Sequence, residues 1–281
     1  MSTTNETRIR ALMYLLSDPD ERIAQIVHDQ LVQIGSSALS YLQCMGQQRP
    51  ELALRLNAVK EAICFRQLLQ EFQDICHSPS QPLDLEAGAF LIARTAYPDL
   101  DPQPYIHMLD DMAEDLRARH VGESSIEESL LTINRYLFDE QGFVGNREDY
   151  YDPDNSFLHR VIDRRKGIPI SLSVLYLLVG VRLRLPLAGV SLPGHFMLTV
   201  KDHQPAIFID CFNNGQFLTE EDCALFLNEA GIAFRPRFLR HSSHDQILAR
   251  MLRNLIGIYQ SRHERSCVRR FQALMTIIDP T

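Results

Sequence analysis

Apolar positions recur at helical spacing through the first 78 residues. The stripes predict helices that end at residue 16 and at Gly35, a short third helix at 38–45 and a long fourth helix at 50–76. The sequence Ser-Asp-Pro-Asp at 17–20 stops the first helix and caps the second. Two helices joined in this way resemble one HEAT-type repeat, and a plain helical bundle fits the same pattern.

The clearest linker signal is the Ser- and Pro-rich sequence at 77–82. After it, helical stripes are predicted at 85–96, 104–120 and 123–138. Residues 139–160 then lose periodicity while holding two Gly, one Pro and many charges. A long irregular segment inside a compact domain is typically functional or packed as an ordered loop.

The pattern changes to mixed helix and strand after Gly167. An apolar helix is predicted at 171–184, with Pro169 at its first position, where the missing N–H costs nothing. Three β-rich runs follow at 187–192, 195–200 and 206–210, then a helix at 220–230 and two helices at 242–278. The second half is therefore expected to be α+β.

We expect three regions: a helical region at 1–78, an α+β core at 79–240 that includes its leading helices, and a helical tail at 241–281. In the tail, Leu255 and Tyr259 fall at the spacing of a single degenerate TPR motif, and a simple helical hairpin explains them somewhat better.

Composition narrows the function classes. The chain has 281 residues, of which 45% are hydrophobic, and this apolar fraction, with 13 Gly and 14 Pro, excludes disordered and collagen-like classes. The net charge of −8 excludes a global attraction for nucleic acid or anionic membrane. The most apolar run, 174–181, is less than half a membrane span. The first residues do not have the charged, apolar and small-residue order that is typical of a signal peptide. The six cysteines show no CxxC spacing. We expect a cytoplasmic protein with free thiols.

Metal and cofactor chemistry is not expected. His241 and His244 have a metal-like spacing, but a capping or surface role before the last helices explains them better. The acidic residues at 148–154 lie among Arg147, His159 and Arg160, which indicates ion pairing rather than a cation site. No Gly-rich phosphate loop is present.

Two of the strand runs bring a histidine and a carboxylate together. Side chains alternate between the two faces of a strand, which fixes the face of His195 in the run 195–200 and of Asp210 in the run 206–210. If the two runs pair as an antiparallel hairpin with a loop at 201–204, His195 lies opposite Asp210. Opposed residues have Cβ atoms about 5 Å apart, so a hydrogen bond is in reach. A carboxylate on one imidazole nitrogen leaves the other as a base, which is two-thirds of a catalytic triad. A purely structural pair fits as well.

Long sequence motifs surround that pair. Gly-Ile-Pro-Ile-Ser-Leu-Ser at 167–173, Leu-Pro-Gly-His-Phe at 192–196 and Phe-Ile-Asp-Cys-Phe-Asn-Asn-Gly at 208–215 resemble the SirB-type (YchA-like) bacterial proteins of the transglutaminase-like superfamily. The resemblance extends upstream through 142–153 and covers about residues 80–281. It implies a papain-like α+β core, a helix packed on a small antiparallel sheet, followed by TPR-like helices.

The resemblance also implies a site with a missing part. Active members carry a Cys nucleophile in a Gly-x-Cys setting at the start of the core helix, followed by the His and the Asp. His195 and Asp210 match the last two positions, but the Cys position is Pro169, which has no nucleophile. The aromatic residue two positions after the His, usually Trp, is Met197 here, and the chain has no Trp.

Other residues are weak substitutes for the thiol. Ser171 lies two helical residues further on, about 200° around the axis from the Cys position, so a helix-start hydroxyl is the better interpretation. Cys211 is expected to point away from Asp210, and Cys223 to face the core. In this family the segment with Asn146, Arg147, Glu148, Tyr150 and Tyr151 looks like a structural loop beside the cleft or a ligand-binding edge.

Three hypotheses follow. The first is a non-catalytic binding or scaffold module whose partner is another protein, with the helical flanks as its contact surface. The second is a hydrolase or acyl-transfer enzyme that uses His195 and Asp210 with Ser171 or another nucleophile. In the third, the His–Asp pair only stabilises the core.

Overall fold

A computed structural model describes residues 3–77 and 83–279. The chain forms two compact units, Met1–Asp74 and Ile75–Thr281, which we describe separately. The boundary predicted at 78/79 and most of the predicted linker lie outside the described residues, as do residues 280–281 of the tail.

The first unit is helical, as its apolar stripes predicted. It contains α1 (Thr3–Leu15), α2 (Glu21–Ile34), α3 (Leu39–Gln48) and most of α4 (Ala53–Cys76), with short 3-10 turns before α3 and α4. Asp20 caps α2 by accepting from the N–H of Arg22. The helices bury one shared apolar core.

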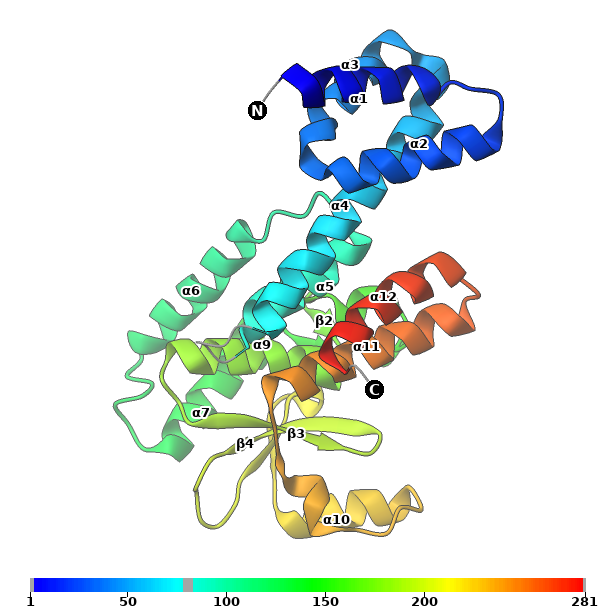
Figure 1. Cartoon of the computed structure of the whole chain (residues 1–281). Helices are drawn as coiled ribbons and strands as arrows, with labels where there is room; N and C mark the ends of the chain where they lie inside the picture. Colours follow the sequence, from blue (N-terminus) through cyan, green and yellow to red (C-terminus); the bar gives the residue numbers. More distant parts are fainter. Residues whose placement is uncertain (1–2, 78–82, 280–281) are drawn as a thin grey trace. The chain divides into compact units, whose positions relative to one another are not determined.

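The second unit contains the end of α4 and residues 83–279. Residues 83–279 form eight α-helices and two sheets (Figure 1). The helices are α5 (Leu85–Ala96), α6 (Gln103–Arg117), α7 (Ile126–Asn134), α8 (Leu158–Arg164), α9 (Pro169–Arg182), α10 (Glu220–Glu229), α11 (His244–Ser261) and α12 (Arg265–Ile278). Two details differ from the prediction. The helix that was predicted to reach 138 continues as a π-helix at Arg135–Glu140. The end of the segment predicted as irregular begins α8, which has only seven residues and is too short for a periodic signal.

The main sheet is antiparallel, with five strands in the order β6–β5–β4–β3–β7. They are β3 (Leu187–Leu192), β4 (His195–Val200), β5 (Phe208–Asp210), β6 (Gln216–Leu218) and β7 (His241–Ser242). A parallel pair, β1 (Val144–Gly145) with β2 (Lys166–Gly167), ties the loop after 145 to the start of α9. The first two predicted runs match β3 and β4. The sequence missed β1, β2, β6 and β7 because two or three residues show no alternation.

The two faces of the main sheet carry different helices. The backbone of α9 lies so close to β3 that a Cβ at Gly180 would stand 2.6 Å from Leu187. On the other face, Cys223 and Leu227 of α10 pack in a small core with residues of β3, β4 and β5 (Figure 1). Residues of β4 that share a face with Met197 of that core therefore point toward α10.

Candidate functional site

The strand register differs from the predicted one by two residues. Leu198 pairs with Ile209 and Thr199 with Phe208, so Asp210 aligns with Met197 rather than with His195. The predicted register put Val200 opposite Pro205, which has no N–H to donate to the ladder. The connection is consequently longer and covers 201–207. Because the shift is even, both side chains keep the predicted common face.

His195 and Asp210 meet across the two strands despite that shift. Nε2 of His195 lies 2.9 Å from Oδ2 of Asp210, although the ring N–H is not aimed along that line, so the contact is better described as electrostatic than as a well-directed hydrogen bond. Oδ1 accepts from the N–H groups of Phe212 and Asn213, and Oδ2 from the Asn213 amide at 2.7 Å. Burial opposes ionisation of Asp210, but the contacts with His195 and Asn213 outweigh it and hold the pKa below its usual value.

Aromatic rings enclose the imidazole. The ring of Phe226, from α10, lies 5.3 Å from that of His195, and Phe212 lies 6.4 Å away on the 3-10 turn after β5. The His195 side chain is 11% exposed. Neither phenylalanine was predicted as a site residue. Phe212 belongs to the motif at 208–215, and Phe226 carries no local signal because it approaches from a separate helix.

Pro169 occupies the first turn of α9, as the sequence predicted, and is buried. Ser171 Oγ accepts from the Ile168 N–H at 3.0 Å and donates to the carbonyl oxygen of Asn155 at 2.5 Å. Its side chain is therefore a buried helix-start hydroxyl that also links α9 to the preceding loop. The first turn of α9 provides no other side-chain nucleophile.

The two thiols near the site are buried. Cys211, next to Asp210, is fully buried in contact with Ser173, and burial raises the pKa of its thiol. Burial, with help from Asp222, raises the pKa of the Cys223 thiol to about 12. Reactive cysteines are thiolates in electropositive, accessible surroundings, and these two have the opposite properties.

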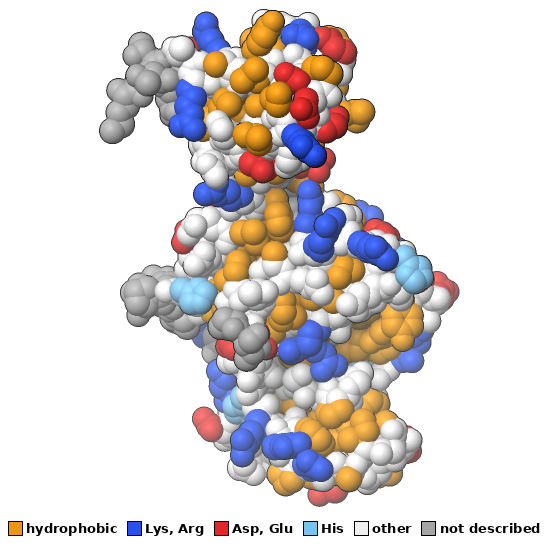
Figure 2. Space-filling view, turned by 45° about the vertical axis from the view of Figure 1, so that its right-hand side comes forward, with side chains coloured by type: hydrophobic (Ala, Val, Ile, Leu, Met, Phe, Trp, Pro, Cys, Tyr) orange, Lys and Arg blue, Asp and Glu red, His pale blue; other side chains and the backbone are white. Residues whose placement is uncertain are grey.

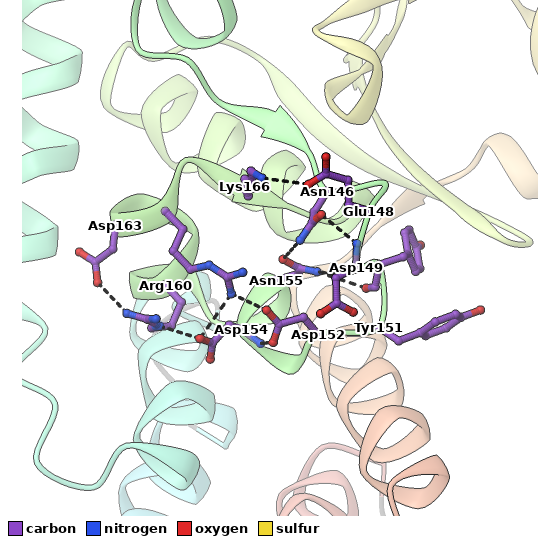
Figure 3. A network of polar contacts seen from close by, with 12 residues as sticks. Asn146, Glu148, Asp149, Tyr151, Asp152, Asp154, Asn155, Arg160, Asp163 and Lys166 are labelled. Atoms are coloured by element: carbon purple, nitrogen blue, oxygen red, sulfur yellow. Dashed lines mark hydrogen bonds and ion pairs between the residues drawn. The ribbon is translucent and has the colours of Figure 1, made fainter.

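The loop at 146–151 is held by two buried asparagines (Figure 3). Asn146 donates to Oδ1 of Asn155 at 3.0 Å and accepts from the N–H of Asp149, and Asn155 donates to the carbonyl of Asp149 at 2.7 Å. Asn155 also anchors Ser171 through its carbonyl, so the loop and the start of α9 form one hydrogen-bonded unit. The sequence analysis did not single out Asn155.

The other loop residues predicted for a cleft edge lie on or near the surface. Glu148 is exposed and pairs with Lys166 at 3.5 Å, and Tyr151 is 70% exposed. Arg147 stacks over the Phe212 ring at 5.0 Å and donates to Asn213. The half-buried Tyr150 packs edge-on against Phe212 at 5.9 Å. Arg147 and Tyr150 are thus connected to His195 through Phe212.

The acidic residues after the loop form ion pairs, as predicted. Asp154 pairs with Arg160 at 2.9 Å and accepts from Tyr97, while Asp152 pairs with Arg164 at 2.6 Å (Figure 3). No group of three metal-ligand side chains occurs within residues 3–77 and 83–279. His241 lies in β7 and His244 begins α11, where its ring contacts the Leu83 carbonyl.

His159, next to this ion-pair network, has a buried ring nitrogen without a partner and packs against Tyr97 at 4.6 Å. Burial lowers the pKa of His159 to about 4, below its usual value of about 6.5, so the unfolded state binds more protons between these values. We therefore expect the free energy of unfolding to fall by about 2 kcal/mol from pH 7 to pH 5 because of this residue. Urea unfolding at both pH values measures this.

The matched comparison uses His159→Phe and the exposed His107→Gln. His159→Phe should remove most of the loss between pH 7 and pH 5, whereas His107→Gln should retain it. An unchanged pH dependence in His159→Phe would show that the buried imidazole is not its source.

The arrangement of helix, histidine strand and aspartate strand resembles a transglutaminase-like core. Residues 103–253 match the family described as the transglutaminase-like superfamily. The chain belongs to that superfamily and to the UPF0162 proteins, as the relatives below show.

A UPF0162 protein of Xylella fastidiosa strain Temecula1 is 37% identical over 205 residues, which are 68% of this chain and 70% of the relative. A UPF0162 protein of Vibrio cholerae is 28% identical over 64% of this chain and 67% of the relative. The human F-box only protein 21 is 34% identical over 152 residues, which are 49% of this chain but 24% of that protein. No solved structure matches the chain. Among the described residues, no helix has the length and apolarity to cross a membrane.

Proposed function

We propose that this protein is a non-catalytic, protein-binding module built on a transglutaminase-like core. The observation that carries the proposal is Pro169, at the position that the resemblance assigns to the thiol of active superfamily members. Proline has no nucleophilic atom, and its ring fills a buried position at the start of α9. His195 and Asp210 then remain as a pair without a group to activate.

The surroundings of the site support this proposal. The side chain of Ser171 is buried and engaged with the Asn155 carbonyl, and the nearby thiols have raised pKa values. The enzyme alternative needs Ser171 to leave that hydrogen bond and to reach a base. Such a change would also break the contact that links α9 to the 146–151 loop.

The similarity to F-box only protein 21 supports the binding part of the proposal. A related region of 152 residues occupies 24% of that much longer protein, as expected for a module that recurs in different contexts. Within this proposal, the chain is a SirB-type protein that acts in the cytoplasm. The helices of the first unit serve as HEAT-like contact surfaces, and α11 with α12 as a TPR-like hairpin. Stacking of Tyr259 on Phe271 at 5.4 Å ties that hairpin together.

An acyl-reactive probe tests the absence of catalysis. Wild-type protein, His195→Ala and Ser171→Ala are incubated with a fluorophosphonate and with an acyl-transfer ester, and covalent labelling is followed by intact-protein mass. We expect the same low labelling in all three proteins, because no activated nucleophile is present. Labelling of the wild type that disappears in His195→Ala would overturn the proposal, and its loss in Ser171→Ala as well would identify the nucleophile.

A further inference from the structure

Three arginines at or next to the Tyr150 and Phe212 rings lack acidic partners in the described part of the chain. Arg147, Arg250 and Arg253, which we call the arginine rim, have no carboxylate at ion-pair distance among residues 3–77 and 83–279, although the chain carries a net charge of −8. Nearby arginines behave differently, since Arg160 and Arg164 both bind aspartates. On the face that Figure 2 shows, Lys and Arg side chains lie beside hydrophobic surface in the larger unit.

Arg250 is the central member of the rim. It projects from α11 and is partly buried, and its Nη1 donates only to neutral acceptors, Ser191 Oγ at 3.3 Å and the Leu192 carbonyl at 3.4 Å. Leu192 is the strand partner of His195, and the Ser191 side chain points to the other face of the sheet, so Arg250 lies at the same end of the β3–β4 ladder as His195 but on the opposite face. Burial and the neighbouring Arg253 both lower the pKa of Arg250, as expected for a charge that lacks compensation. Buried charges are normally paired, so this guanidinium is prepared for an anion.

Aromatic surface separates Arg250 from Arg147. Arg147 lies over Phe212, and Tyr150 packs against the same ring while it interacts electrostatically with Arg250. Tyr151, which is 70% exposed, packs edge-to-face against Tyr150, with 5.3 Å between the ring centroids. The rim therefore offers cationic points on different sides of an aromatic surface. Two separate carboxylates can each pair with one of these guanidinium groups. The net charge of −8 opposes a nucleic acid, with its many phosphates, more than a segment with two carboxylates.

We propose that the arginine rim binds a short, extended segment of a partner protein through two acidic side chains, with Tyr150 and Phe212 contacting the residue between them. In an extended segment, side chains two residues apart share one face and are separated by about 7 Å. Aromatic side chains with arginine are the usual anchors of protein interfaces. This inference rests on the proposed function, because it assigns the chemistry of the partner.

Immobilised heptapeptide pools test this site with the full-length protein. One pool fixes Glu at positions 3 and 5, a second fixes Gln there, and a third carries one phosphoserine, with the other positions randomised without charged residues. We expect the Glu pool to bind on the order of tenfold more tightly than the Gln pool at 0.1 M salt. Arg250→Gln should remove that preference. Lys201→Gln, which deletes a charge at the opposite end of the β3–β4 ladder, should keep it.

If Arg250→Gln lowers the melting temperature, Arg253→Gln provides a second test. Arg253 is exposed, so its substitution should weaken the preference for the Glu pool without loss of stability. Equal binding of the Glu and Gln pools, or a preference that survives both arginine substitutions, would overturn the inference. Tighter binding of the phosphoserine pool or of a single-stranded oligonucleotide would overturn its assignment to carboxylates. None of these variants touches His195, so the acyl-probe experiment judges the absence of catalysis independently.

Discussion

Replacement of Asn155 by alanine is expected to lower the free energy of unfolding by about 3–4 kcal/mol. Asn155 is fully buried, and its side chain holds the 146–151 loop through hydrogen bonds with the Asn146 amide and the Asp149 carbonyl. Its backbone carbonyl accepts from Ser171 at the start of α9. The substitution leaves the buried Asn146 amide and the Asp149 carbonyl without their side-chain partner and empties the space of a fully buried side chain. A buried group left unpaired costs about 1–3 kcal/mol, and the lost packing adds to it. Urea unfolding followed by circular dichroism measures the loss.

The matched control is Asn228→Ala. Asn228 is exposed on α10, so its removal should change stability by less than about 0.5 kcal/mol. A loss below about 1 kcal/mol in Asn155→Ala would mean that this hydrogen-bonded unit does not hold the loop in solution.

The second large effect is expected for Gly215→Ala. Gly215 has a φ of +74°, and a Cβ there would lie 2.4 Å from the side chain of Asn134. Strain in the left-handed region costs about 1–2 kcal/mol and crowding about 1–3 more, so we expect a loss of about 3 kcal/mol. The effect reaches the site, because the Gly215 N–H donates to the Asp210 carbonyl at 2.9 Å.

Gly142→Ala separates the two contributions to that loss. Gly142 has a nearly equal φ of +73°, but a Cβ there would meet nothing within 4 Å. This variant should therefore show the backbone strain alone, about 1–2 kcal/mol. Equal losses in the two alanine variants would show that the contact with Asn134 has no energetic weight.

Much of the fold follows from local pattern. The strands β3 and β4 and the helix α5 match the predicted boundaries because each combines strong periodicity with clear end signals, such as the Asp84 cap of α5. The helices of the first unit occur where they were predicted, although α3 ends three residues later than predicted and α4 begins three residues later. The misses are short: β1, β2, β6 and β7 have two or three residues each, and such strands form only because a longer neighbour provides their hydrogen bonds.

The candidate site was partly accessible to sequence reasoning. Side-chain alternation together with the predicted hairpin put His195 and Asp210 on one face, and their contact survived an error of two residues in register. The enclosure of His195 by Phe226, the asparagine pair at 146 and 155, and the unpaired Arg250 were not accessible. Each depends on elements far apart in the sequence, whose approach is decided by packing rather than by local propensity.

If Pro169 stands at the nucleophile position of a transglutaminase-like site, Pro169→Cys restores a thiol there, and the reactivity of that thiol shows whether His195 can act on it. A thiol at a helix N-terminus has a lowered pKa, and a histidine within reach lowers that pKa further. Because position 169 is buried, the reference for this thiol is the same thiol without the histidine. We predict that the thiol of Pro169→Cys reacts with iodoacetamide at pH 6 on the order of tenfold faster than the thiol of the variant that also carries His195→Ala. Equal rates in the two variants would contradict the proposal, because the thiol at 169 would then not depend on His195.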